Sequence, residues 1–180
     1  TLAFNGGMNR WDAEAVTATC EKTGDGYTLN GEYRYVIDGH TADLLIVAAR
    51  DASSSGEEGI SLFLVPSDTA GVSRQWLPTM DQARKQATVT LSGVCVGTDA
   101  VLGGQGDGWR ALAKVLDLAS IALAAEQVGG CQQLLDMTVE YTSERVQFNR
   151  TIASFQAVKH KAADMMLQVE VARSAAYYAA

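Results

Sequence analysis

The hydrophobic pattern of this chain changes its period once, and that change limits what the chain can fold into. From Ala15 to about Val96, short apolar runs alternate with turn residues, which is typical of β-strands. From Trp109 onward, apolar residues recur at helical spacing, and no proline interrupts them. The change falls at the glycine-rich residues 103–108. The sequence therefore predicts a β-sandwich or barrel that is followed by long helices.

Two continuous apolar runs mark the clearest strands of the first half. Residues 44–48 and 60–65 are apolar throughout, as expected of strands that are buried on both faces. Residues 23–26 predict a turn, and the pair Asn30-Gly31 predicts a second, tight hairpin turn. The other expected strands are residues 16–19, 27–29, 33–37 and 88–91.

The second half predicts two helices that are separated by a break near residues 149–152. We expect the first helix to continue through Gly129-Gly130, although each glycine costs roughly 1 kcal/mol in a helix, because close helix packing uses small residues. Ser154 is the expected N-cap of the second helix. That helix reaches Ala180 without a stop signal, so we expect the helical domain to continue. The predicted domains are residues 1–103 and 104–180.

Charge and composition exclude several classes of function. The 180 residues carry 14 basic and 21 acidic side chains, a net charge of −7, which disfavours nucleic-acid and anionic-membrane partners. No apolar run approaches the roughly 20 residues that a membrane span needs. The three distant cysteines, Cys20, Cys95 and Cys131, form no metal-binding motif, so no metal is expected and a reducing, cytoplasmic location is the simplest interpretation.

Residues 141–156 carry the chemistry that the sequence offers. Arg145 and Arg150 have forked donors that suit phosphate oxygens, Phe148 offers a flat face to a purine, and Gln147 can pair with a base or ribose edge. The alternative is a solvated helix end with one buried phenylalanine, and from the spacing alone this alternative is the simpler one. The helical half is nearly neutral, with 7 basic and 8 acidic side chains, and is the better host for an anionic cofactor.

Three stretches of the chain resemble the acyl-CoA dehydrogenase family. Residues 141–156 are similar to its signature Y-x-x-x-R-x-Q-F-G-R-x-I…F-Q, and residues 96–103 (V-G-T-D-A-V-L-G) are similar to V-P-x-x-x-x-L-G. Residues 30–43 resemble N-G-x-K-x-(W/Y)-I-T-N-G-x-x-A-D. The order and spacing of the three agree. The resemblance implies a fragment of that α+β fold, with an antiparallel β-sandwich or barrel domain followed by long antiparallel helices of a helical bundle.

The resemblance also implies FAD as the cofactor. In this family, the arginine that matches Arg145 reaches an FAD pyrophosphate that is held mainly by a neighbouring subunit. The residues that match Gln147, Phe148, Phe155 and Gln156 lie near the same cofactor. These five positions are the expected cofactor-binding residues. Arg150 is either a further ligand or a salt-bridged helix terminus.

The chain departs from the family at its flavin-binding segments. Residues 2–10 stand where the family has L-T-E-P-G-A-G-S-D, so that Ala3 replaces a threonine. In the second segment, W-I-T becomes Tyr35-Val36-Ile37, and Ile37 cannot form the hydrogen bond of the threonine. Each lost bond to a buried flavin edge costs roughly 1–3 kcal/mol. We therefore expect a degenerate flavin bed in this chain.

No catalytic base can be identified in the sequence. Residues 115–120 resemble the family's D-x-x-R, with Asp117 kept and Ser120 in place of the arginine, so both are candidate substrate contacts. Some family members carry the catalytic glutamate where Ala119 stands, and most carry it beyond Ala180. Asp117 as a base is possible, but a satisfied helix carboxylate is the simpler interpretation.

The resemblance implies flavin-dependent α,β-dehydrogenation of an acyl-CoA thioester, in which a carboxylate removes the α-proton and hydride passes from the β-carbon to the flavin. The leading hypothesis is one subunit of a hetero-oligomer, a dimer of dimers with a homologous subunit, similar to α2β2 enzymes of steroid side-chain catabolism. Electron-transfer flavoprotein is a possible acceptor. The alternatives are a complete homotetrameric enzyme and a non-catalytic scaffold on the same fold.

Overall fold

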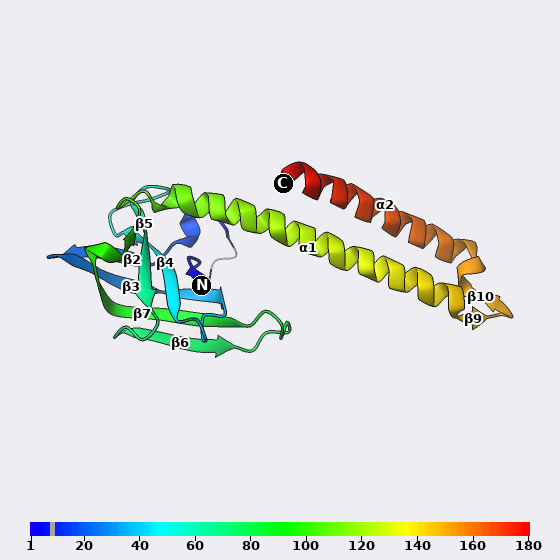
Figure 1. Ribbon diagram of the computed structural model, residues 1–180, viewed down its shortest axis with the longest axis horizontal. Coiled ribbons are helices and arrows are strands. Elements are labelled where there is room, and N and C mark those ends of the chain that lie inside the picture. Colours follow the sequence, from blue (N-terminus) through cyan, green and yellow to red (C-terminus); the bar gives the residue numbers. More distant parts are fainter. Residues whose placement is uncertain (8–9) are drawn as a thin grey trace. The chain divides into compact units, whose positions relative to one another are not determined.

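The computed structural model describes residues 1–7 and 10–180 and divides into two compact units. The first unit, Thr1–Lys114, is mainly β-structure, and the second, Val115–Ala180, is a pair of helices (Figure 1). Helix α1 (Gly108–Glu144) begins inside the first unit and provides half of the second. The predicted domain boundary between residues 103 and 104 stays a prediction.

The described part of the first unit forms one mixed, eight-stranded sheet in the order β6-β7-β3-β2-β4-β5-β8, with β1 beside β4. Two short 3-10 helices, η1 (Ala13–Ala15) and η2 (Thr98–Ala100), interrupt the strands. The strands are β1 (Leu2–Ala3), β2 (Thr19–Thr23), β3 (Gly26–Ile37), β4 (Leu44–Asp51), β5 (Ile60–Pro66), β6 (Val72–Leu77), β7 (Gln86–Gly97) and β8 (Val101–Leu102).

The strand pairs are antiparallel with two exceptions, because β1 and β2 both run parallel to β4. Strands β2 and β3 form a hairpin, and the chain then returns to place β4 on the far side of β2, which makes β2 and β4 parallel. The expected α+β fold is confirmed, and the sheet is mixed where the sequence predicted antiparallel strands.

The predicted hairpin turn at Asn30-Gly31 is wrong. Strand β3 continues through both residues and pairs with β7 on either side of a bulge. Gly31 has a φ of +155° and lies so close to Ala18 that a side chain would collide with it. The side chain of Asn30 accepts a hydrogen bond of 2.7 Å from the amide of Gly93. Gly31, which the sequence pattern assigned to a turn, therefore allows β3 to pass close to Ala18.

The apolar runs that predicted buried strands supply the core of the first unit. Tyr33, Leu45 and Phe63 are fully buried, and the Phe63 ring lies edge-on to Tyr27 with centroids 5.2 Å apart. Burial of each such side chain contributes roughly 1.5–3 kcal/mol to the free energy of folding. The buried cluster is completed by Ala3, Ala18, Cys20, Leu29, Val36, Val47, Ala49, Val65, Val89, Leu91 and Val94.

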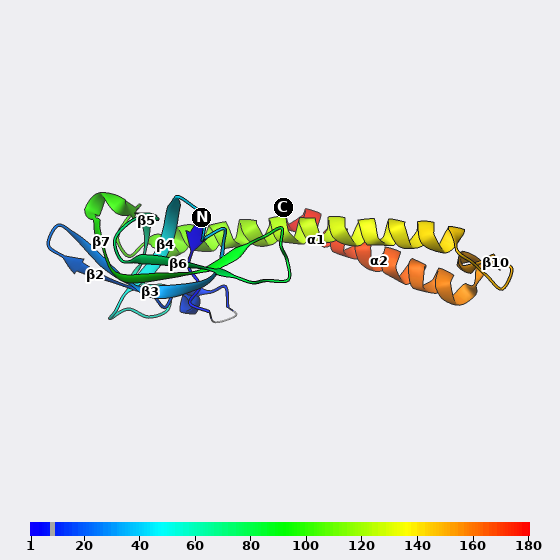
Figure 2. The same cartoon turned by 90° about the horizontal axis from the view of Figure 1, so that it is seen from below.

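The second unit is an antiparallel helix pair. After α1, the chain forms a hairpin of β9 (Val146–Gln147) and β10 (Arg150–Thr151), then η3 (Ile152–Ser154), and returns as α2 (Gln156–Ala179) alongside α1 (Figures 1 and 2). Arg173 on α2 donates a hydrogen bond of 2.6 Å to Gln132 on α1. None of the described helices is both long and apolar enough to cross a bilayer.

Two details of the helices differ from expectation. Helix α1 does run through Gly129-Gly130, but within the described chain the space beside both glycines is open, so no close helix packing explains them. Ser154 is not the N-cap of α2. Its hydroxyl donates to the carbonyl of Thr151 at 2.7 Å, and Phe155 occupies the cap position instead.

Candidate functional site

The predicted cofactor-binding residues gather on the hairpin that joins the two helices. Gln147 pairs with Arg150 across β9 and β10, and Phe148 and Asn149 form the two-residue turn. Their φ angles are +53° and +59°, as in a type I′ turn, whose twist matches that of the strands. Asparagine tolerates this left-handed backbone better than most residues. The sequence thus builds a tight hairpin at the end of a long helix.

Arg145 lies between the end of α1 and the hairpin. Its amide donates to the carbonyl of Tyr141 at 2.9 Å, and its own carbonyl accepts from the amide of Ile152 at 2.8 Å. The backbone is therefore fixed on both sides. The side chain is exposed, and among the described residues its guanidinium has no hydrogen-bond or ion-pair partner. An anchored backbone with a free, permanently charged fork is suited to an anionic group.

Two aromatic rings and a second cation lie beside this fork. Phe148 is 86% exposed, and its ring stands edge-on to that of Phe155 with centroids 6.0 Å apart. The guanidinium of Arg150 lies 4.1 Å from the centroid of the Phe155 ring, a cation–π contact. No carboxylate of the described residues forms a salt bridge with Arg150, so the alternative of a salt-bridged helix terminus finds no support and the ring contact stands in its place.

The donor set of the hairpin fits a diphosphate that carries a planar base. Gln147 and Gln156 are exposed at the two ends of the hairpin segment, and neither side chain has a hydrogen-bond partner in the described chain. Arg145 can contact phosphate oxygens, and the exposed face of Phe148 can stack on a base. The chemistry required of an FAD-diphosphate site is therefore present on this segment.

A hollow of ≈370 Å³ in the β unit brings the two expected flavin-bed segments together. Phe4 and Trp11 form one wall, with ring centroids 6.1 Å apart. Tyr35 and Ile37 come from the second segment. Met8 and Asn9, which belong to the first segment, lie outside the described residues. The remaining lining residues are Leu2, Asn5, Arg34, Val36 and Gln86.

Tyr35 has an unusual backbone at this hollow. It lies within β3 at a bulge between Tyr33 and Val36, and its φ is +59°. A residue with a side chain costs about 1–2 kcal/mol in this left-handed conformation. The bulge interrupts the register with β7 and aims the half-exposed Tyr35 ring at the hollow instead of the core. Strain of this kind is concentrated at functional sites.

Of the two positions where the sequence departs from the family, only one lines the hollow. Ala3 is fully buried in the core of the β unit and does not line the hollow, whereas Ile37 lines it with a partly exposed alkyl side chain. The carbonyl of Ile37 already accepts a bond of 2.6 Å from the hydroxyl of Thr1. A flavin edge at Ile37 would find no side-chain hydrogen bond, while Asn5, Arg34 and Gln86 place polar side chains elsewhere around the hollow.

The candidate substrate residues lie on α1, away from both features in sequence. Asp117 is exposed. The hydroxyl of Ser120 donates to the carbonyl of Leu116 at 2.8 Å, so it is already engaged within the helix. No carboxylate is among the described residues that line the hollow in the β unit, and no cluster of three metal-ligating side chains occurs in the described chain.

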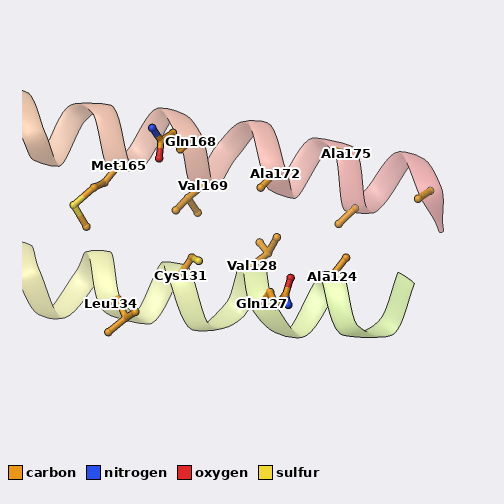
Figure 3. Close-up of a pocket in the computed structure, with 12 residues that line it drawn as sticks. Ala124, Gln127, Val128, Cys131, Leu134, Met165, Gln168, Val169, Ala172 and Ala175 are labelled. Atoms are coloured by element: carbon orange, nitrogen blue, oxygen red, sulfur yellow. The ribbon is translucent and has the colours of Figure 1, made fainter. Parts of the chain in front are cut away.

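A second hollow, of ≈600 Å³, lies between the facing sides of α1 and α2 (Figure 3). Its lining is mostly small alkyl side chains, with Gln127 and Gln168 as polar members and Cys131 as a thiol (Figure 3). It holds no charged side chain. This hollow resembles an uncovered part of a helix interface more than a site for an anionic cofactor.

Sequence reasoning missed Phe4, Trp11 and Arg34 as lining residues of the first hollow. Phe4 belongs to the first expected flavin-bed segment, and Arg34 lies within residues 30–43, directly before the second one. Trp11 carried no signal of its own, because nothing in the spacing indicates that it folds back onto Phe4.

Comparison with known proteins gives matches along nearly the whole chain. The family model for the acyl-CoA dehydrogenase middle domain matches residues 7–94, and the model for the C-terminal domain matches residues 106–180. The short/branched chain specific acyl-CoA dehydrogenase of Bos taurus mitochondria is 34% identical, over 94% of this chain and 40% of its own length. The short-chain specific acyl-CoA dehydrogenase of Megasphaera elsdenii is also 34% identical, over 94% of this chain and 45% of its own.

Solved structures agree with the sequence matches. The structure of a glutaryl-coenzyme A dehydrogenase complex with glutaryl-CoA is 30% identical and superposes with a TM-score of 0.91. The match covers 99% of this chain and 46% of that one. The chain therefore spans less than half of the length of the relatives that it matches.

Proposed function

This chain belongs to the acyl-CoA dehydrogenase family, and on that premise we propose that it takes part in FAD-dependent α,β-dehydrogenation of an acyl-CoA thioester. Relatives named as short-chain, branched-chain and glutaryl-CoA dehydrogenases support this reaction class. FAD, when bound, would supply the two-electron oxidant that the dehydrogenation needs. The residues of this chain would bind and orient the cofactor and shield it from solvent.

The free guanidinium of Arg145 is the observation that carries the proposal. Its backbone is fixed by two hydrogen bonds, while its side chain has no partner among the described residues. We assign to it the diphosphate of FAD seated on a neighbouring subunit. Gln147 and Gln156 would reach polar edges of the same cofactor, and Phe148 and Phe155 would border it with their rings.

The flavin ring would then lie mainly on a partner chain. Ile37 offers no side-chain hydrogen bond to the hollow in this chain, and Phe4 and Trp11 reduce the polarity of that hollow. We propose a homologous acyl-CoA dehydrogenase subunit as the partner, in a dimer of dimers, with lipid or steroid acyl-CoA thioesters as substrate. Asp117 and Ser120 are kept as candidate substrate contacts, and electron-transfer flavoprotein as a candidate acceptor.

One observation favours a second candidate, the complete homotetrameric enzyme. The hollow of ≈370 Å³ is open and has the aromatic Tyr35 at its edge, so a flavin ring could bind there through backbone groups alone. In that case each copy would hold one flavin ring and lend its hairpin to another copy.

We place the protein in the cytoplasm. Cys95 and Cys131 are exposed, free thiols, and Cys20 is a buried one. Exposed free thiols persist in reducing compartments and are oxidised elsewhere.

Flavin absorbance separates the candidates. The native protein is purified alone and after co-expression with a homologous acyl-CoA dehydrogenase chain. We expect bound flavin only with the homologous chain. Bound flavin in the protein alone would support the homotetramer, and no flavin in either preparation would contradict an FAD-dependent role.

Arg145→Ala tests the assigned contact. A charge-assisted hydrogen bond contributes about 1.5–3 kcal/mol, so FAD retention should fall by about tenfold or more. Arg110→Ala is the matched control, because Arg110 is an exposed arginine at the other end of the same helix. Equal retention in both variants would remove Arg145 from the site.

A further inference from the structure

Arg50 on strand β4 uses its guanidinium entirely on backbone carbonyls. Its Nε donates to Val16 at 2.8 Å, and its Nη2 donates to both Ala13 and Gly56 at 2.8 Å. Its Nη1 donates to Ser54 at 3.4 Å. One half-buried side chain thus joins η1, the segment after it and the loop between β4 and β5. Neither Arg50 nor its four acceptors belong to the stretches that resemble family motifs.

The segment that Arg50 holds is tied directly to a wall of the hollow in the β unit. Ala15, which lies between the two carbonyls that Arg50 contacts on this segment, accepts a hydrogen bond of 2.9 Å from the amide of Gly6. Gly6 also packs so closely on Thr17 that a side chain would collide with it. The amide of Arg34 in turn donates a hydrogen bond of 2.9 Å to the carbonyl of Asn5.

Each ring of the aromatic wall lies next to a residue that these contacts hold. Phe4 precedes the Asn5 and Gly6 contacts, and Trp11 precedes Asp12, whose carboxylate caps η1 through the amide of Glu14 at 3.2 Å. The edge-on contact of Phe4 with Trp11 therefore depends on where η1 lies. Arg50 does not line the hollow, so any influence on a ligand passes through η1.

We propose that Arg50 is a positioning residue that holds η1 against the sheet and so sets the place of the Phe4–Trp11 wall. Three separate carbonyls lie within 2.8 Å of one rigid fork, which a lysine ammonium on a flexible stem cannot reproduce. The ligand of this hollow, a flavin ring, rests on the second candidate of the proposed function, in which each copy holds its own ring. The contact between Arg50 and η1 does not depend on it.

Hydrogen–deuterium exchange of the native protein tests the mechanical link without a ligand. In Arg50→Met, the amides of Gly6 and Arg34 should exchange about tenfold faster, because their acceptors move with η1. Arg50→Lys should give a smaller increase. Arg74→Met is the control, since Arg74 also donates to a backbone carbonyl of the β unit, that of Ala42, at 2.8 Å. Unchanged exchange at Gly6 and Arg34 in Arg50→Met would overturn the proposal.

FAD binding by the homo-oligomer, in which the hollow of this chain would itself hold the flavin ring, tests the consequence for the site. Arg50→Met should weaken FAD binding by about fivefold or more and change the flavin absorbance envelope. Val94→Ala, a core truncation outside the hollow, should lower stability without either change. Faster exchange with unchanged FAD affinity would also overturn the positioning role.

Two other results, a variant that does not fold and a protein that binds no FAD, also have a defined interpretation. If Arg50→Met does not fold, Arg50→Lys and Gly6→Ala, which act at the two ends of the same link, decide by the same two readouts. If the unmodified protein binds no FAD without a homologous chain, the homotetramer candidate fails, and exchange at Gly6 and Arg34 alone decides whether Arg50 fixes the wall.

Discussion

The β unit completes its apolar core within the chain, whereas the helix pair leaves much of its apolar surface exposed. Tyr33, Leu45 and Phe63 are fully buried in the first unit. In the second unit, large side chains that remain exposed include Leu118, Leu134, Met137, Val139, Met166, Leu167, Val171, Tyr177 and Tyr178. The first unit buries its large core side chains within the chain, and the second needs further protein surface to bury its apolar side chains.

Two arginines show the same contrast for polar groups. Arg50 in the β unit donates to four backbone carbonyls, while the guanidinium of Arg145 at the helix hairpin has no partner among the described residues. A satisfied arginine contributes to structure, and a free one on a fixed backbone is available for a ligand. Under the proposed function, Arg145 of the helical unit binds the ligand and Arg50 of the β unit supports the fold.

Truncation of a large apolar side chain should lower the free energy of unfolding much more in the β unit than in the helix pair. Phe63→Ala leaves a cavity beside Tyr27 and should lower the free energy of unfolding by about 3–5 kcal/mol. Leu134→Ala removes a side chain that is 61% exposed and should lower it by less than about 1 kcal/mol. Urea unfolding of both variants measures the difference. Similar losses would show that the helix pair has a core of its own and would break the comparison.

The pH dependence of stability should reveal the closed interior of the β unit. Burial, with a further contribution from the Asp51 carboxylate, raises the pKa of the Cys20 thiol from 9.0 to about 11. Below pH 9 the thiol keeps its proton in the folded and the unfolded chain. Between these values only the unfolded chain loses it, so stability should fall as pH rises, by up to about 1.4 kcal/mol per pH unit.

Cys20→Ala provides the measurement for this thiol. The slope of the free energy of unfolding between pH 9 and pH 11 should become shallower in Cys20→Ala than in the unmodified protein. Cys95→Ala, which removes an exposed thiol, should leave the slope unchanged. A slope that responds equally to both substitutions would show that Cys20 is not shielded from solvent.

Substitutions at Asn149 in the hairpin turn should change stability through backbone conformation and not through burial of the side chain. Asn149 is exposed with a φ of +59°, so Asn149→Val should lower stability by about 1–2 kcal/mol while Asn149→Gly has little effect. Thermal unfolding compares the two variants. If valine is tolerated as well as glycine, the hairpin is not the fixed platform that the site requires.

The smallest expected effect is the coupling of Arg150 to Phe155. A double-mutant cycle with Arg150→Met and Phe155→Leu should give a coupling free energy of about 0.5–1 kcal/mol, because the cation–π contact is exposed. Urea unfolding of the two single variants and the double variant supplies the cycle. A coupling near zero would leave both side chains independent and would weaken the distinction between a supported hairpin and a solvated helix end.

Much of the fold could be predicted, because burial leaves a clear pattern in sequence. The runs at residues 44–48 and 60–65 became β4 and β5, and helical spacing from Trp109 became α1. Strand β6 was missed because most of its residues are exposed and carry no such pattern. The bulge at Gly31 was mistaken for a turn, since its conformation is set by Ala18, which no local signal identifies.

The site was predictable only in part. Arg145 to Gln156 are near in sequence, so a single hairpin brings them together. The aromatic wall and the Arg50 contacts depend on long-range folding of residues 2–16 onto β3 and β4, and side-chain spacing carries no record of it. Chemistry that is local in sequence could be predicted, and chemistry assembled by tertiary contacts could not.

The central claim is that Arg145 binds the diphosphate of FAD, and comparison of FAD with riboflavin tests it most directly. Riboflavin has the same ring system and lacks the diphosphate. In the flavin-binding complex, Arg145→Met should raise the dissociation constant for FAD by about tenfold or more and leave that for riboflavin unchanged. Equal losses for the two ligands, or no loss for either, would contradict the account.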